Sequence, residues 1–262
     1  MTTSADPTRR RLMQFIAGAP LLPLASSFAS AASLTGCGSD SAAPALTSVS
    51  FTSMAAPSLS TPANMATTYV ASSLVANFDD KSSQTFTLGY QPFFITGSSV
   101  SDGKGGTVIA GGYYDINNQP IMDTSVAGSV RQFFSDCPDG ASLIKLDSTT
   151  VTGIKGKPVF AVVQFEYTTR NQALTSMYGL LPSPIAVLTL DQDQATGKLS
   201  LVKYHNVDTS GVKGLWITCG ASLSPWNTHL SSEEYEPDAT LTTNAQLQGF
   251  STNLFGNATT AS

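Results

Sequence analysis

Hydrophobic residues fall in short runs that are separated by clusters of glycine, proline, asparagine and aspartate. Residues 159–167 are almost continuously apolar, which predicts a strand buried on both faces. Residues 142–146 alternate between polar and apolar side chains, which predicts a strand with one buried face. Further strand-like runs lie at 85–90, 107–110 and 113–116. The pattern therefore predicts many short strands joined by tight turns.

The strongest local signal is a β-hairpin formed by residues 185–190 and 198–204. Two alternating runs flank the segment 191–197, which is rich in turn-forming aspartate and ends in glycine. Asp191 and Asp193 also resemble the start of a calcium-binding loop. The glycine falls one place late for an EF-hand and no glutamate closes the loop, so a hairpin turn is the better interpretation.

Helical periodicity is weak, and short helices are expected only near 65–77 and 125–134. Repeated short strands predict an all-β fold, either a propeller or a sandwich. Residues 38–66 are rich in serine, alanine, threonine and proline, which is typical of a flexible tether. The folded domain is therefore expected over 67–262.

The first 37 residues have the order of elements of an export signal. Arg9, Arg10 and Arg11 precede an apolar region that prolines interrupt, so the region is too broken to span a membrane. Leu34-Thr35-Gly36-Cys37 fits a lipoprotein cleavage box, in which the Cys37 thiol receives a diacylglyceryl group. This order predicts a twin-arginine signal peptide over 1–37 and a lipid anchor on Cys37.

Two alternatives to this interpretation of the leader stay open. The arginines also fit the basic region of an ordinary secretory signal. Cleavage after Ala29-Ser30-Ala31 would leave Cys37 without a lipid. In the preferred interpretation the protein is a bacterial lipoprotein, exported by the twin-arginine route and held in the periplasm or at the outer membrane.

The charge and cysteine content of the chain indicate which partners and cross-links to expect. Charged residues make up 12% of the chain, the formal net charge is −5, and no basic patch follows the leader. Nucleic-acid binding needs clustered lysine and arginine, so we expect no nucleic-acid partner. Beyond Cys37 the chain has two cysteines, Cys137 and Cys219, which could pair as a disulfide in an oxidising compartment.

One segment, residues 216–234, contains residue types that could bind a metal ion. Cys219 is followed by small residues, by Ser224-Pro225-Trp226, by a short strand and by the pair Glu233-Glu234. A loop that reverses the chain would bring the strand back toward the cysteine, so a thiolate and two carboxylates would converge. That set suits iron, and a harder cation such as Ca²⁺ would take the carboxylate oxygens. A solvated acidic pair and a Cys137–Cys219 disulfide are the simpler alternatives.

This segment resembles the signature of the PhoX-type alkaline phosphatases, a family with a six-bladed propeller. The matching positions keep their spacing and are Cys219, Ser224, Pro225, Trp226, Thr228, Leu230, Glu233 and Glu234. A weaker similarity lies at residues 163–168, where Glu166 matches a glutamate of the family pattern. Asn227 stands where the family has glycine, and Phe165 stands where it has histidine.

The resemblance implies a phosphomonoesterase that uses iron and calcium, with Cys219, Glu233, Glu234 and Glu166 as metal ligands and a small phosphate ester as substrate. Family members are about twice as long, so the resemblance implies an amino-terminal portion or a truncated paralogue, a partial β-propeller that we expect to be monomeric. A catalytic residue is not identified. The alternative is a non-catalytic, lipid-anchored surface propeller that acts as a binding or scaffold protein.

Overall fold

The regular structure is mostly antiparallel β-sheet, which confirms the predicted all-β class. The computed structural model describes residues 44–56, 58, 60, 70–146, 149–235 and 244–256. The chain divides into two compact units, one reaching Pro92 and including 194–198, the other formed by 93–193 and the residues from Leu199 on. The single domain expected over 67–262 therefore differs from the observed organisation.

The first unit is built on a three-stranded antiparallel sheet in the order β1 (Leu46–Phe51), β2 (Ser73–Phe78) and β3 (Ser83–Thr87). Strand β1 lies inside the segment predicted to be a flexible tether, so that prediction is wrong for these six residues. Pairing with β2 satisfies the backbone of β1, which composition alone does not reveal. The helix predicted near 65–77 is wrong where it overlaps β2.

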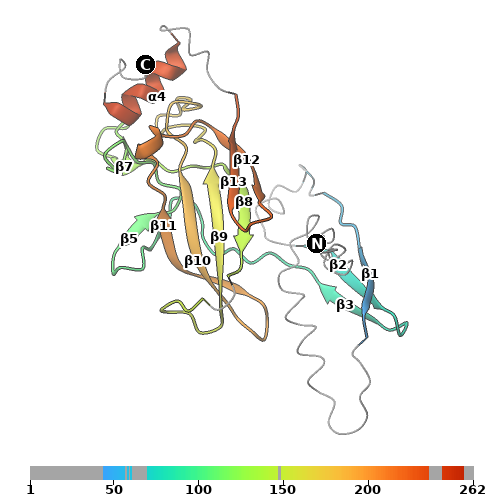
Figure 1. Cartoon of the computed structure of the whole chain (residues 1–262). Coiled ribbons are helices and arrows are strands. Elements are labelled where there is room, and N and C mark those ends of the chain that lie inside the picture. The colour runs from blue at the N-terminus through green and yellow to red at the C-terminus, as the bar shows by residue number, and fades with distance from the viewer. Residues whose placement is uncertain are drawn as a thin grey trace, which may run out of the picture. The chain divides into compact units, whose positions relative to one another are not determined.

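The second unit contains a four-stranded antiparallel sheet (Figure 1) made of β8 (Pro138–Ile144), β9 (Lys157–Phe165), β10 (Ile185–Gln192) and β11 (Leu199–Asn206). Each strand pairs with its neighbours in the chain. The predicted hairpin at 185–204 and the predicted buried strand at 159–167 are confirmed. Asp191 accepts hydrogen bonds from the backbone of Lys155 and Gly156, so its carboxylate holds the segment directly before β9.

Alternation of side chains explains where the main core lies. Strand β9 places Val159, Ala161, Val163 and Phe165 on one face, where they pack with alternate residues of β10 and with Tyr204. The other face of β9 carries Val162 and Gln164, which are also buried. A strand with two buried faces needs apolar residues at nearly every position, which is the pattern that the sequence shows.

The hairpin of β12 (Thr218–Leu223) and β13 (His229–Glu233) lies beside β8 (Figure 1), and Gln164 of β9 hydrogen-bonds to it. Two smaller ladders join β4 (Ser99–Ser101) with β5 (Thr107–Ile109) and β6 (Met122–Asp123) with β7 (Arg131–Gln132). The helix predicted near 125–134 is wrong, because this segment forms a turn and β7. The strand predicted at 113–116 is reduced to a single bridge from Tyr114.

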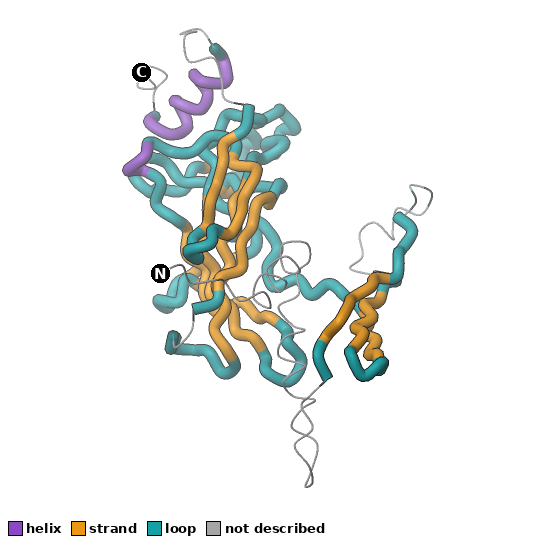
Figure 2. The backbone as a smooth tube through the Cα atoms, turned by 45° about the vertical axis from the view of Figure 1, so that its right-hand side comes forward, coloured by secondary structure: helices purple, strands orange, loops and turns teal. Residues whose placement is uncertain are grey.

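Helix α4 (Ala245–Phe255) is a feature that the sequence pattern did not reveal, and it follows a short 3₁₀ turn, η1 (Ser210–Val212), along the chain (Figure 2, purple). The Asn244 side chain caps its amino terminus by accepting two backbone N–H groups, and Gly256 ends it in a left-handed conformation. Phe250 and Leu254 pack against Trp216 and Ile217. The helix therefore covers residues directly before β12.

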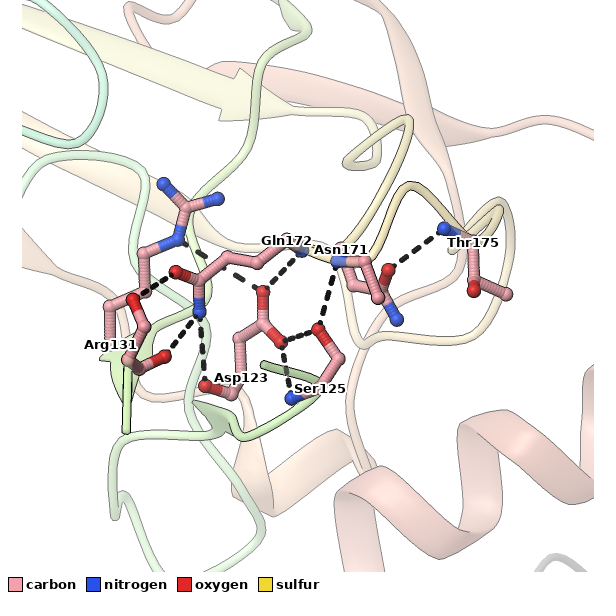
Figure 3. A network of polar contacts seen from close by, with 8 residues as sticks. Asp123, Ser125, Arg131, Asn171, Gln172 and Thr175 are labelled. Atoms are coloured by element: carbon pink, nitrogen blue, oxygen red, sulfur yellow. Dashed lines mark hydrogen bonds and ion pairs between the residues drawn. The ribbon is translucent and has the colours of Figure 1, made fainter. Parts of the chain in front are cut away.

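A buried carboxylate joins two loops of the second unit (Figure 3). The Asp123 side chain is fully buried and accepts hydrogen bonds from the Ser125 backbone and hydroxyl and from the Gln172 backbone. Burial acts to raise the pKa of Asp123, but these hydrogen bonds outweigh it and keep that pKa below its usual value. Arg131 adds an ion pair at 4.0 Å. The charge is therefore paired and serves the fold.

Candidate metal centre

Two β-bulges, each formed by a potential ligand followed by glycine, shape the candidate site. In β8, Asp139 and Gly140 together oppose the single residue Gln164 of β9. In β12, Cys219 and Gly220 together oppose Ser232 of β13. A bulge leaves one residue out of the ladder and turns its side chain away from the normal alternation. Both potential ligands are thereby released from the regular faces of their sheets.

The side chains of Asp139, Glu166 and Cys219 converge on one point. One potential ligand atom from each lies within 4.8 Å of the other two. Asp139 comes from β8, Glu166 directly follows β9, and Cys219 comes from β12. The Glu234 carboxylate interacts with the Cys219 thiol and so lies beside this group of three. Segments that lie far apart in the sequence thus bring two carboxylates and one thiol together, with a third carboxylate next to the thiol.

The carboxylates give this group an excess of negative charge. Hydrogen bonds to Asp139 and Glu234, aided by burial, raise the pKa of Cys219 to about 12. Burial and the charges of Asp139 and Glu234 raise the pKa of Glu166. Within the described residues no lysine or arginine lies at salt-bridge distance from these carboxylates. A cation at this point would stabilise every member of the group.

The pair Glu233-Glu234 separates, although the sequence interpretation assigned both residues to the metal. The Glu233 carboxylate accepts a hydrogen bond of 2.7 Å from the Trp216 backbone, whereas Glu234 binds the Cys219 thiol. Successive residues at a strand end point to opposite sides, so the two carboxylates cannot both face the cysteine. Glu233 therefore has a structural partner outside the convergent group.

Neither described cysteine forms a disulfide, and both are free thiols. Cys137 donates toward the Asp136 carboxylate at 3.5 Å, and burial raises the pKa of the Cys137 thiol. Cys219 instead contacts Asp139 and Glu234. Each thiol therefore has its own carboxylate partners, and this arrangement favours two free cysteines over the disulfide alternative.

The turn between β12 and β13 explains one departure from the family signature. Asn227 adopts a left-handed conformation with φ of 67°, and its backbone N–H bonds to Ser224. Glycine and asparagine are the residues that best tolerate this conformation, so asparagine can replace the family's glycine here. Trp226, another residue of this signature, is 69% exposed, so its side chain does not pack behind the loop.

Asp139 is the member of the group that sequence reasoning missed. It lies in the segment Cys137-Pro138-Asp139-Gly140, which carries no recognised motif. The only signal is an acidic residue followed by glycine near the start of a strand, which is compatible with a bulge but also with an ordinary turn. Its role depends on the pairing of β8 with β9, which is not local.

The donor set fits the metals that the resemblance implies. Thiolate with carboxylate oxygens suits iron, and the carboxylates alone suit calcium. Comparison of the chain with protein-family models, with curated proteins and with solved structures finds no match. Cys37 and the rest of the leader lie outside the described residues. Where the chain is described, no helix has the length and apolar character needed to cross a membrane.

Proposed function

We propose that this chain is an exported, metal-dependent phosphomonoesterase of the PhoX type, with iron and calcium held by Asp139, Glu166, Cys219 and Glu234. The observation that carries the proposal is the convergence of Asp139, Glu166 and Cys219 from three separate segments, with Glu234 next to the Cys219 thiol. Three of the four residues belong to the motifs on which the resemblance rests. Bound metal would polarise the oxygens of a phosphoryl group and supply the charge that the group itself lacks.

Within this proposal the residues of the chain have distinct tasks. Cys219 supplies a thiolate once its proton is displaced, and Asp139 and Glu234, which both interact with the thiol, can accept that proton. Glu166 and Asp139 supply carboxylate oxygens. Their negative charges repel each other, so a bound cation would stabilise both. The four-stranded sheet with consecutive antiparallel strands has the form of one propeller blade, which supports a partial propeller.

The test is metal analysis and turnover of p-nitrophenyl phosphate on the purified full chain. Wild-type protein should retain iron and calcium and release p-nitrophenol, whereas Cys219→Ala should lose iron and turnover. Cys137→Ala is the matched control, because this thiol lies outside the group within 4.8 Å. Wild-type protein with neither metal nor turnover would refute the proposal.

A non-catalytic, lipid-anchored binding or scaffold protein is the second candidate. A phosphate ester is an anion, and the described residues place no lysine or arginine beside the carboxylates to attract it. Metal retention without any turnover would favour this candidate. Both candidates share the lipid anchor, so Cys37→Ala should move the protein from the membrane to the soluble fraction.

A further inference from the structure

Gln164 lies between the two bulges and contacts both. It is fully buried, and it is the residue of β9 that opposes Asp139 and Gly140. Its amide nitrogen donates to the backbone oxygens of Cys219 and, at 3.2 Å, Gly220. These are the two residues of the second bulge. One side chain thus bridges the strand segments that carry Asp139 and Cys219.

The two backbone oxygens fix the orientation of this amide, and His229 completes its hydrogen bonds. The Gln164 amide oxygen lies 3.1 Å from Nε2 of His229. An amide nitrogen offers two hydrogens, and both are needed for the two backbone oxygens. If the amide were flipped, its oxygen would face the backbone oxygen of Cys219, and these two acceptors would repel each other. The amide oxygen therefore faces His229, whose Nε2 must donate.

This assignment fixes the direction of a complete chain of hydrogen bonds. Neutral histidine with its proton on Nε2 accepts at Nδ1, where the Ser142 hydroxyl lies at 2.9 Å. Ser142 therefore donates to His229, His229 donates to Gln164, and Gln164 donates to the bulge at Cys219. Burial lowers the pKa of His229, which favours this neutral form.

We infer that Gln164, oriented by His229, is a positioning residue that holds the Cys219 bulge so that the thiol faces Asp139 and Glu166. The expected effect of this positioning on metal affinity rests on the proposed function. Hydrogen-bond partners behind a metal ligand typically change metal affinity about 10- to 100-fold. A purely structural amide would change stability and leave the thiol unchanged.

Cobalt(II) is the probe for metal binding by the full chain, because thiolate ligation produces a charge-transfer absorption. Gln164→Met keeps the shape and removes the amide, so we expect weaker cobalt binding by about tenfold or more, with reduced charge-transfer intensity. Gln192→Met is the matched control. Gln192 is also a buried glutamine of the same sheet, and its amide nitrogen has no hydrogen-bond partner among the described residues. Unchanged affinity and absorption in a folded Gln164→Met protein would overturn the inference.

A second pair of variants keeps the inference testable should Gln164→Met fail to fold. His229→Gln can still donate to Gln164, whereas His229→Leu cannot. We expect wild-type cobalt absorption in the first and reduced absorption in the second. Equal absorption in both would contradict the role of His229.

Alkylation of the metal-free protein separates this inference from the proposed function. The rate at which iodoacetamide modifies Cys219, read by peptide mapping with Cys137 as internal reference, reports thiol position without metal. We expect a severalfold change in Gln164→Met and none in Gln192→Met. Wild-type protein that binds no cobalt would refute the metal function, and the alkylation rates would still decide the positioning role.

Discussion

At Gly140 strand β8 lies close against β12, and a single added methyl group tests that packing. A Cβ at this position would lie 2.5 Å from the Cys219 oxygen, 2.5 Å from the Ala221 Cβ and 2.6 Å from the Gln164 amide nitrogen. Two of these neighbours cannot turn aside, because one is backbone and the other is a Cβ. Gly140→Ala must therefore push β12 away from β8.

The magnitude follows from two opposing effects. Overpacking of this kind costs about 1–3 kcal/mol. Alanine also restricts the unfolded chain, which returns about 0.4–1 kcal/mol where the native backbone suits it. Gly140 does not have a positive φ, so this gain applies. We expect the free energy of unfolding to fall by about 1–2 kcal/mol, together with weaker cobalt binding, since Cys219 moves relative to Asp139.

Urea denaturation and cobalt titration on the same preparations provide the measurement. Gly211→Ala is the control, because a Cβ there meets nothing within 4 Å and φ is not positive. Equal stability of the two variants would refute the close packing of the bulges. A destabilised Gly140→Ala protein with wild-type cobalt affinity would refute the argument that the bulges align the ligands.

Three further predictions concern single side chains. Asp123→Ala removes the acceptor for two backbone N–H groups and should lower the free energy of unfolding by about 3 kcal/mol in urea denaturation, whereas a change below 1 kcal/mol would contradict its role. Burial lowers the pKa of His229 below 6.5, so the unfolded chain binds the proton more tightly and stability should fall as the pH drops through that value. His229→Gln should show a shallower fall between neutral pH and about pH 5, and an unchanged slope would count against this. Glu233→Ala should cost about 1–2 kcal/mol of stability by orphaning the Trp216 N–H while leaving metal content unchanged, and Glu234→Ala should do the reverse, so equal effects would contradict their separation.

The local pattern along the chain predicted the elements whose causes are local. The hairpin at 185–204 follows from two alternating runs around a turn, and the buried strand at 159–167 follows from continuous apolar residues. The approach of Glu234 to Cys219 was also predicted from residue order, because a short hairpin returns the chain to its starting point. Each of these inferences needs only neighbours in sequence.

Tertiary structure decided which carboxylates belong to the group. Asp139 joins it and Glu233 leaves it because bulges and strand ends change the direction of a side chain, and a bulge exists only once two distant strands have paired. Strand β1 forms for a similar reason, since its backbone pairs with that of β2. The amino-acid sequence by itself determined the local strands and suggested the chemistry that is proposed for them. The pairing of those strands decided which candidate ligands converge, because the register of distant strands sets where each side chain points.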